Sequence, residues 1–169
     1  MSERTEIIEG ERYASPAATR EHQEVVGRVL SLLLPFVNAN KLGEVIQGPV
    51  DVRFQDGDSV QPDLVFVRSE RAHIITERGV EGAPDVIVEV VSSATATLDY
   101  HMKRDRYAHF GVPEYWIVDP QKRELAIWTP ENRLRPRLCV DANEAFTWHP
   151  RPDGAALTIR ISELLHDID

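Results

Sequence analysis

Glu89 lies inside a run of valines and isoleucines, where a carboxylate needs an explanation. The stretch "PDVIVEVVSS" begins with proline, ends with serines and places five β-branched residues around the glutamate. Such a run is typical of a buried strand. A buried carboxylate without a partner would cost several kcal/mol or give up its charge. We therefore expect a compensating partner, which could be a metal ion, a cationic side chain or a proton.

A second carboxylate can reach Glu89 from a neighbouring strand. Two predicted strands open with the same dipeptide, "QPDLVFV" with Asp63 and "APDVIVEV" with Asp85. Side chains four residues apart on one strand lie about 13 Å apart, so Asp85 cannot share an ion with Glu89, whereas Asp63 can. Asp63, Glu89 and the backbone carbonyl of Val90 then form an all-oxygen set that suits Mg²⁺ or Mn²⁺.

Lys103 is a cation that the sequence offers to these carboxylates. In "TATLDYHMKRDRYAHFG" the residues Asp99, Lys103 and Tyr107 are four apart and share one face of a predicted helix. From that face the Lys103 ammonium can orient a water molecule or stabilise charge on a phosphate. The alternative is structural, with Glu89 pairing with Lys103 or Arg104 to hold the helix to the sheet, and Tyr107 in the core.

The elements that position these residues predict a mixed sheet. The third strand, the helix after it and the fourth strand form a βαβ-like crossover, so the fold class is α/β or α+β, with helices flanking the sheet and additional C-terminal strands. We expect one domain over residues 1–169. The predicted elements are a helix with Ser15 as N-cap that bends or ends at Pro35, strands at 42–54, 59–67, 84–92 and 112–120, a helix at 95–111, and a hairpin strand at 124–130.

Composition narrows the functional classes. The chain has 169 residues, a net charge of −9 and one cysteine, Cys139, which excludes an intrachain disulfide and a multi-cysteine metal site. It has no long apolar run, and "MSERTEIIEG" does not follow a signal-peptide plan, so a cytoplasmic protein away from membranes is expected. The negative charge disfavours nucleic-acid binding through a general field. The basic stretches 101–106 and 132–137 could contact phosphates or form solvated faces.

Several of these segments carry a resemblance to a known family. The segments "REHQEVVGRVLSLL", "PDLVFV", "PDVIVEVVSSAT" and "DYHMKRDRYAHFGVPEYWIVDP" resemble, in order, the Uma family of restriction endonucleases in the PD-(D/E)XK nuclease superfamily. The resemblance implies a restriction-endonuclease-like mixed sheet. It also implies a divalent-metal-dependent endonuclease that hydrolyses phosphodiester bonds, expected to be in DNA, and leaves a 5′-phosphate.

The resemblance assigns catalytic roles residue by residue. Asp63 matches the aspartate of the PD motif, and Glu89 matches the (D/E) position, with both as metal ligands beside the Val90 carbonyl. Val91 stands where the superfamily has its lysine, and Lys103 matches a lysine that has migrated to the following helix. The variant Lys103→Ala is then expected to abolish cleavage and leave the fold intact.

Two other residues and a second function stay open. Glu44 matches an additional glutamate of such nucleases or has a surface role, and His22 is a core histidine on the apolar stripe of the first helix or a family site residue. A homodimer is expected by analogy, because cutting both strands calls for two copies. The alternative function is a catalytically inactive nuclease-fold module for binding or assembly, which the charge of −9 favours.

Overall fold

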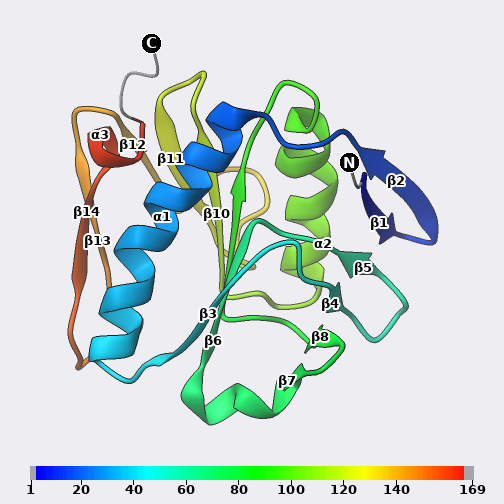
Figure 1. Ribbon diagram of the computed structural model, residues 1–169, viewed down its shortest axis with the longest axis horizontal. Helices are drawn as coiled ribbons and strands as arrows, with labels where there is room; N and C mark the ends of the chain where they lie inside the picture. Colours follow the sequence, from blue (N-terminus) through cyan, green and yellow to red (C-terminus); the bar gives the residue numbers. More distant parts are fainter. Residues whose placement is uncertain (1–2, 166–169) are drawn as a thin grey trace.

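The computed structural model describes residues 3–165, which form two six-stranded sheets and a two-stranded sheet, with helices on both sides of the longer strands (Figure 1). The strands are β1 (Arg4–Ile8), β2 (Glu11–Ser15), β3 (Gly43–Gln47), β4 (Val52–Arg53), β5 (Ser59–Val60), β6 (Leu64–Arg68), β7 (Ile75–Thr76), β8 (Gly79–Glu81), β9 (Val86–Val90), β10 (Glu114–Asp119), β11 (Glu124–Trp128), β12 (Leu138–Asp141), β13 (Ala145–Trp148) and β14 (Leu157–Arg160). The helices are α1 (Arg20–Ala39), the 3₁₀ turn η1 (Ser69–Ile74), the π-helical turn η2 (Leu98–Lys103), α2 (Arg104–His109) and α3 (Ile161–Leu164).

The larger strands form a mixed sheet in the order β12-β11-β10-β9-β6-β3. Strands β9 and β10 are parallel, and η2 and α2 make the crossover between them, while the other neighbours are antiparallel. The predicted mixed sheet with a βαβ crossover is therefore confirmed. Both faces are covered, which explains why β9 reads as a continuous apolar run.

Strand β9 distributes its side chains between two cores. Val86, Val88 and Val90 pack on the side of α1, whereas Ile87 and Val91 pack on the side of α2. Because side chains alternate along a strand, Glu89 faces the α2 side together with Ile87 and Val91. The alternation thus aims this carboxylate at η2, which carries Lys103.

Helix α1 begins later than the sequence predicts. Its N-cap is Thr19, whose hydroxyl accepts a hydrogen bond from the His22 N–H, and not Ser15. Ser15 instead ends β2, where it pairs with Arg4. The helix also continues past Pro35 to Ala39, and its last turn buries Val37 against the core.

The first residues of the chain, which lie outside the elements predicted from the sequence, form the hairpin β1–β2. Its two-residue turn is Glu9–Gly10, with φ of 54° and 79°, as in the turns that favour hairpins. Strand β1 adds to the second sheet, which has the order β2-β1-β5-β4-β8-β7. Arg4, Glu6 and Ile8 alternate toward the interior, so the hairpin delivers two charged side chains inward.

The predicted strand at 42–54 is also divided. Strand β3 ends at Gln47, and β4 belongs to the other sheet. Gly48 lies so close to residue 62 that an added Cβ would be 2.3 Å from the Pro62 carbonyl oxygen, and Pro49 has no N–H for a strand ladder. The C-terminal strands β12, β13 and β14 agree with the predicted short strands. None of the helices in residues 3–165 is long and apolar enough to cross a membrane.

Candidate active site

Asp63 and Glu89 lie on adjacent antiparallel strands and converge on one cation. Asp63 directly precedes β6, which pairs with β9, and its Oδ2 accepts a hydrogen bond from the Val90 N–H at 2.8 Å. Its Oδ1 lies 3.1 Å from Nη1 of Arg4, and the same nitrogen lies 3.7 Å from Oε2 of Glu89. The structure therefore brings together the two carboxylates that the sequence pairs.

Asp85, the aspartate of the other predicted strand that opens with Pro-Asp, is held elsewhere. Its Oδ2 accepts a hydrogen bond from the Arg68 N–H at 2.8 Å, and its Oδ1 lies 3.1 Å from Nη1 of Arg71. These partners fix Asp85 at the start of β9, apart from Glu89, as the sequence predicts. Two identical dipeptides thus have different surroundings.

Lys103 points into the protein and is surrounded by carboxylates. Its Nζ is 2.9 Å from Glu89 Oε1, 2.9 Å from Glu6 Oε1 and 3.2 Å from Asp99 Oδ1, and the residue is only 1% exposed. The ammonium is oriented toward Glu89 as predicted. The ion pair of the structural alternative is present as well, since the same ammonium contacts Glu89 and Asp99.

Strand β1 contributes two residues that the sequence interpretation missed. Arg4 lies between Asp63 and Glu89, and the carboxylate of Glu6, 1% exposed, contacts Lys103 and accepts the Gln61 N–H at 2.8 Å. A signal was available, because "RTEII" and "ERYAS" flank "EG" in the manner of two strands joined by a tight turn.

Three residues that the sequence left open now have defined places. His22 is buried, and its Nε2 lies 3.1 Å from Asp63 Oδ2, so it belongs to the site as well as to the helix interior. The Tyr107 hydroxyl donates to Glu89 Oε1 at 3.4 Å, while its ring packs edge to face on Tyr115 in the core. Glu44 is exposed on β3, which agrees with a surface role.

The cluster carries more negative than positive groups. Two cations, Arg4 and Lys103, face four acidic side chains within a largely buried region. One Glu89 oxygen, Oε2, is buried without a hydrogen-bond partner among the described residues. The acidic side chains are Glu6, Asp63, Glu89 and Asp99. An additional cation would therefore be favourable here.

The two candidate ligands titrate in opposite directions. Burial raises the pKa of Asp63, but the hydrogen bond and charge of His22, together with Arg4 and the Val90 N–H, outweigh it and lower that pKa below its usual value. Burial raises the pKa of Glu89 well above its usual value, and Lys103 only partly offsets this effect. Asp63 is thus held ionised, while ionised Glu89 depends on a nearby positive charge.

Lys103 stays charged although it is buried. Burial lowers its pKa, but Glu89, Asp99 and Glu6 outweigh that effect and raise the pKa well above the usual value. The three N–H bonds of the ammonium match the three surrounding carboxylates. Lys103 therefore holds these acids in place.

The chain offers oxygen ligands of the kind that hard cations prefer. The described residues contain no group of three or more His, Cys, Asp and Glu side chains placed to hold a metal ion. Two carboxylates and one backbone carbonyl remain as candidates, those of Asp63, Glu89 and Val90, and the Val90 N–H donates to Asp63. Asp63, Glu89 and Val90 could together provide three oxygens.

A cavity of about 470 Å³ opens beside Asp63. Arg4, His22 and Asp63 line it, together with loop residues that include Gly48 and Gln61. A phosphate group in this cavity would lie next to Arg4, His22 and Asp63. The cavity therefore gives the Asp63 side of the site access from outside.

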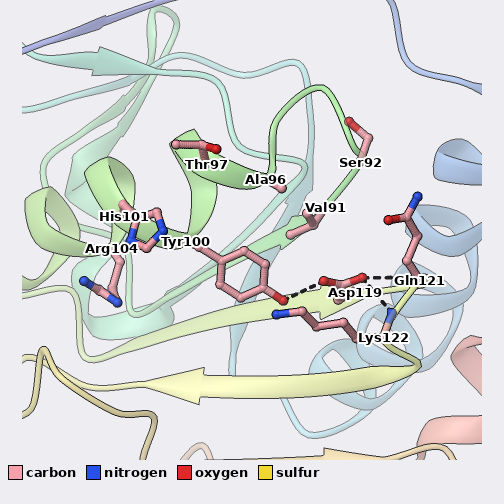
Figure 2. Close-up of a pocket in the computed structure, with 10 residues that line it drawn as sticks. All are labelled: Val91, Ser92, Ala96, Thr97, Tyr100, His101, Arg104, Asp119, Gln121 and Lys122. Atoms are coloured by element: carbon pink, nitrogen blue, oxygen red, sulfur yellow. Dashed lines mark hydrogen bonds between the residues drawn. The ribbon is translucent and has the colours of Figure 1, made fainter.

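A second cavity, of about 350 Å³, lies at the carboxyl ends of β9 and β10 (Figure 2). Its wall includes the cationic side chains of Arg104 and Lys122 and the ring of His101, and the Tyr100 hydroxyl donates to Asp119 at 2.7 Å. The basic stretch 101–106 is thus divided. Its Lys103 is buried in the acidic cluster, and its Arg106 contacts Asp56 and Asp58. Only part of the stretch faces this cavity.

A family comparison identifies the group to which the protein belongs. The model of the Uma2 family, described as "Putative restriction endonuclease", matches residues 1–159. The chain belongs to the Uma2 family. This finding confirms the resemblance found in the sequence and places the protein in a family of nucleases. No curated protein matches.

A solved structure shares the Uma2 chain's fold. It is the "Crystal structure of a putative nuclease belonging to DUF820 from Anabaena variabilis ATCC 29413", with a TM-score of 0.77 and 17% identity. The match covers 95% of this Uma2 chain and 89% of the other chain. The likeness supports the predicted restriction-endonuclease-like fold with its flanking helices.

The variant Glu89→Gln tests how the raised pKa affects stability in this Uma2 protein. A folded-state pKa above the unfolded value of 4.5 contributes stability that is present below that value and is lost as the pH rises through the folded pKa. Gln cannot ionise, so we expect Glu89→Gln to gain stability relative to wild type as the pH rises above 4.5 toward the raised pKa of folded Glu89. Thermal unfolding in chelator measures this difference.

The matched control is Glu44→Gln, which changes an exposed glutamate. Its melting temperature should follow that of wild type at every pH. A large loss of stability in Glu89→Gln across the whole range would show that the pair with Lys103 acts mainly as a structural support.

Proposed function

We propose that this protein is a divalent-metal-dependent endonuclease that hydrolyses phosphodiester bonds in DNA. The observation that carries the proposal is the convergence of Asp63 and Glu89, from neighbouring strands, beside a cavity that reaches the surface. Membership of a nuclease family supports it. Two carboxylates in this arrangement suit metal-assisted hydrolysis better than nucleophilic catalysis.

Some residues of the site would bind the metal, and others position the carboxylates that bind it. Asp63, Glu89 and the Val90 carbonyl would hold Mg²⁺ or Mn²⁺, which when bound supplies a Lewis acid and a more acidic water molecule. His22 and the Val90 N–H fix the Asp63 carboxylate through its Oδ2. Lys103 orients Glu89 through Oε1, and the other oxygen, Oε2, is buried 3.7 Å from Arg4 Nη1.

Local positive charge reconciles the acidic protein with a polyanionic substrate. Arg104 and Lys122 lie at the cavity beside the carboxyl ends of β9 and β10, near the end of the strand that carries Glu89. A bound divalent cation would add to this local charge. We propose that phosphates flanking the cleaved bond contact this cationic wall.

A cleavage assay tests the proposal. Supercoiled plasmid and single-stranded DNA are incubated with the protein in Mg²⁺, in Mn²⁺ or in chelator. We expect nicked or linear products with 5′-phosphate ends in either metal and none in chelator. Cleavage that persists in chelator, or its absence on every substrate in both metals, would contradict the proposal.

A nuclease-fold module without catalysis is the second candidate function. The observation that favours it is Arg4, whose guanidinium lies between the two carboxylates. In such a module Arg4 would be a permanent partner of Asp63 and Glu89. Mn²⁺ would then leave the melting temperature of wild type unchanged, whereas a metal site predicts a rise that Glu89→Gln lacks.

We also propose that two copies of the chain act together on duplex DNA. A single site cuts one strand, and most soluble oligomers are symmetric assemblies of identical chains. Sedimentation velocity with and without a DNA duplex measures the number of chains. A protein that stays monomeric in both conditions would contradict this part of the proposal.

A further inference from the structure

Arg4 is the group that lies where Asp63 and Glu89 converge. Its Nη1 is 3.1 Å from Asp63 Oδ1 and 3.7 Å from Glu89 Oε2, and it donates a hydrogen bond to the Gln61 carbonyl at 2.9 Å. A positive charge at this point satisfies two carboxylates that would otherwise repel each other. Arg4 thus supplies the kind of compensation that a metal ion would give.

The contacts of Arg4 are those of a replaceable partner. All three contacts above use the single nitrogen Nη1, so the guanidinium does not make the two parallel hydrogen bonds of a bidentate pair. Its side chain is 18% exposed, in contrast to Lys103 at 1%. Lys103 is enclosed by three carboxylates, whereas Arg4 borders the surface.

The cavity beside Asp63 has room for the Arg4 guanidinium once it leaves the carboxylates. Arg4 itself lines this space of about 470 Å³, together with His22 and Asp63. A guanidinium displaced from the carboxylates would stay in the same cavity, where a phosphate would meet it. Arginine is well suited to bind phosphate through its planar set of donors.

We infer that Arg4 is an exchangeable cation of the site. In the metal-free protein it neutralises Asp63 and Glu89, and it leaves them when they take up a divalent cation. The released guanidinium then binds a substrate phosphate in the adjoining cavity. The inference rests on the proposed function for its metal and its substrate class. It adds the binding of a substrate phosphate to the role of Arg4 as partner of the two carboxylates.

Two titrations of the purified chain test this exchange, with Arg4→Gln, Arg4→Lys and wild type. Mn²⁺ alone is titrated by calorimetry, followed by inorganic phosphate into the Mn²⁺-saturated protein. In wild type only the fraction of molecules whose carboxylates are free of Arg4 can bind Mn²⁺, and this lowers the apparent affinity for the metal. Arg4→Gln removes the competing cation and should therefore bind Mn²⁺ at least about tenfold more tightly. It should bind phosphate at least about tenfold more weakly.

The other variants make the result specific. Arg4→Lys keeps a competing cation, so its Mn²⁺ affinity should stay close to that of wild type and confirm that charge is responsible. Arg20→Gln, which alters an exposed arginine paired with Glu24, should leave both affinities unchanged. Circular dichroism checks that each variant is folded. If Arg4→Gln unfolds, wild type carries the test, because an equal affinity for inorganic phosphate with and without Mn²⁺ would overturn the exchange.

The outcomes separate this inference from the proposed function. Mn²⁺ binding by Arg4→Gln that is no tighter than in wild type, or phosphate binding that is unchanged, overturns the exchange. Metal-dependent cleavage by wild type alongside that result would leave the endonuclease proposal standing. Opposite shifts in the two affinities without cleavage on any DNA would support the exchange and refute the nuclease.

Discussion

Under the proposed function, replacing Asp63 by Asn is expected to lower the cleavage rate by about a thousandfold, because Asp63 is a proposed metal ligand and such a ligand contributes several kcal/mol to charge stabilisation in the transition state. Asn keeps the size of the side chain but removes the charge that Arg4 and His22 surround. The lowered pKa of Asp63 shows that the protein holds this carboxylate ionised. Initial rates of plasmid nicking at saturating Mg²⁺ measure the loss.

Asp85→Asn is the matched control for this prediction. Asp85 also follows a proline at the start of a strand region, but its partners are Arg68 and Arg71. Its replacement should leave the cleavage rate within about threefold of wild type, while stability falls by about 1 kcal/mol for a lost partly exposed ion pair. Equal losses of activity in Asp63→Asn and Asp85→Asn would contradict the proposed role of Asp63 as a metal ligand.

Lys103→Met is expected to destabilise the fold by about 3 to 5 kcal/mol, since it leaves buried carboxylates without their cation. The ammonium contacts Glu6, Glu89 and Asp99, and Met fills a similar space without charge. This result would contradict the expectation from the sequence that Lys103→Ala leaves the fold intact. Urea unfolding followed by circular dichroism measures the change.

Two further variants locate the cause of that loss. Lys122→Met, an exposed lysine near the ring of Tyr100, should change stability by less than about 0.5 kcal/mol. Adding Glu6→Gln to Lys103→Met should recover part of the loss, because one unpaired carboxylate is removed. A double variant as unstable as the single one would show that packing, not charge, is responsible.

The sequence identified those parts of the site that local pattern reveals. Glu89 stood out because a carboxylate breaks an apolar strand, and Asp63 because only a neighbouring strand brings a second carboxylate near it. The four-residue spacing from Asp99 to Lys103 survives in η2, where the two side chains form an ion pair at 3.2 Å. These relations depend on strand alternation and helix periodicity, both of which operate over a few residues.

The features of the fold and the site that the sequence did not predict depend on contacts between segments distant in the chain. Glu6 is charged and lies near the start of the sequence, and its contacts with Lys103 and the Gln61 N–H explain its burial. Thr19 and Ser15 are both good N-cap residues, and pairing of Ser15 with Arg4 decides between them. His22 fits the apolar stripe of α1, and its contact with Asp63 depends on where β6 begins.

The hairpin β1–β2 joins its sheet through few backbone contacts. Strand β1 pairs with β5 at one register position, Ile7 with Ser59, and the Glu9 N–H donates to the Asp58 side chain at 2.9 Å. Such a unit can open at a lower free energy than the long strands of the main sheet. Its opening would withdraw Arg4 and Glu6 together.

If Arg4 exchanges as inferred above, the attachment of this hairpin and the charge of the site are coupled through thermodynamic linkage. A ligand that binds Asp63 and Glu89 better without Arg4 weakens the hold on β1, and a change that loosens the hairpin strengthens binding of that ligand by the same factor. Substitutions in the turn at Glu9–Gly10 would then alter occupancy of the site through the hairpin that carries Arg4.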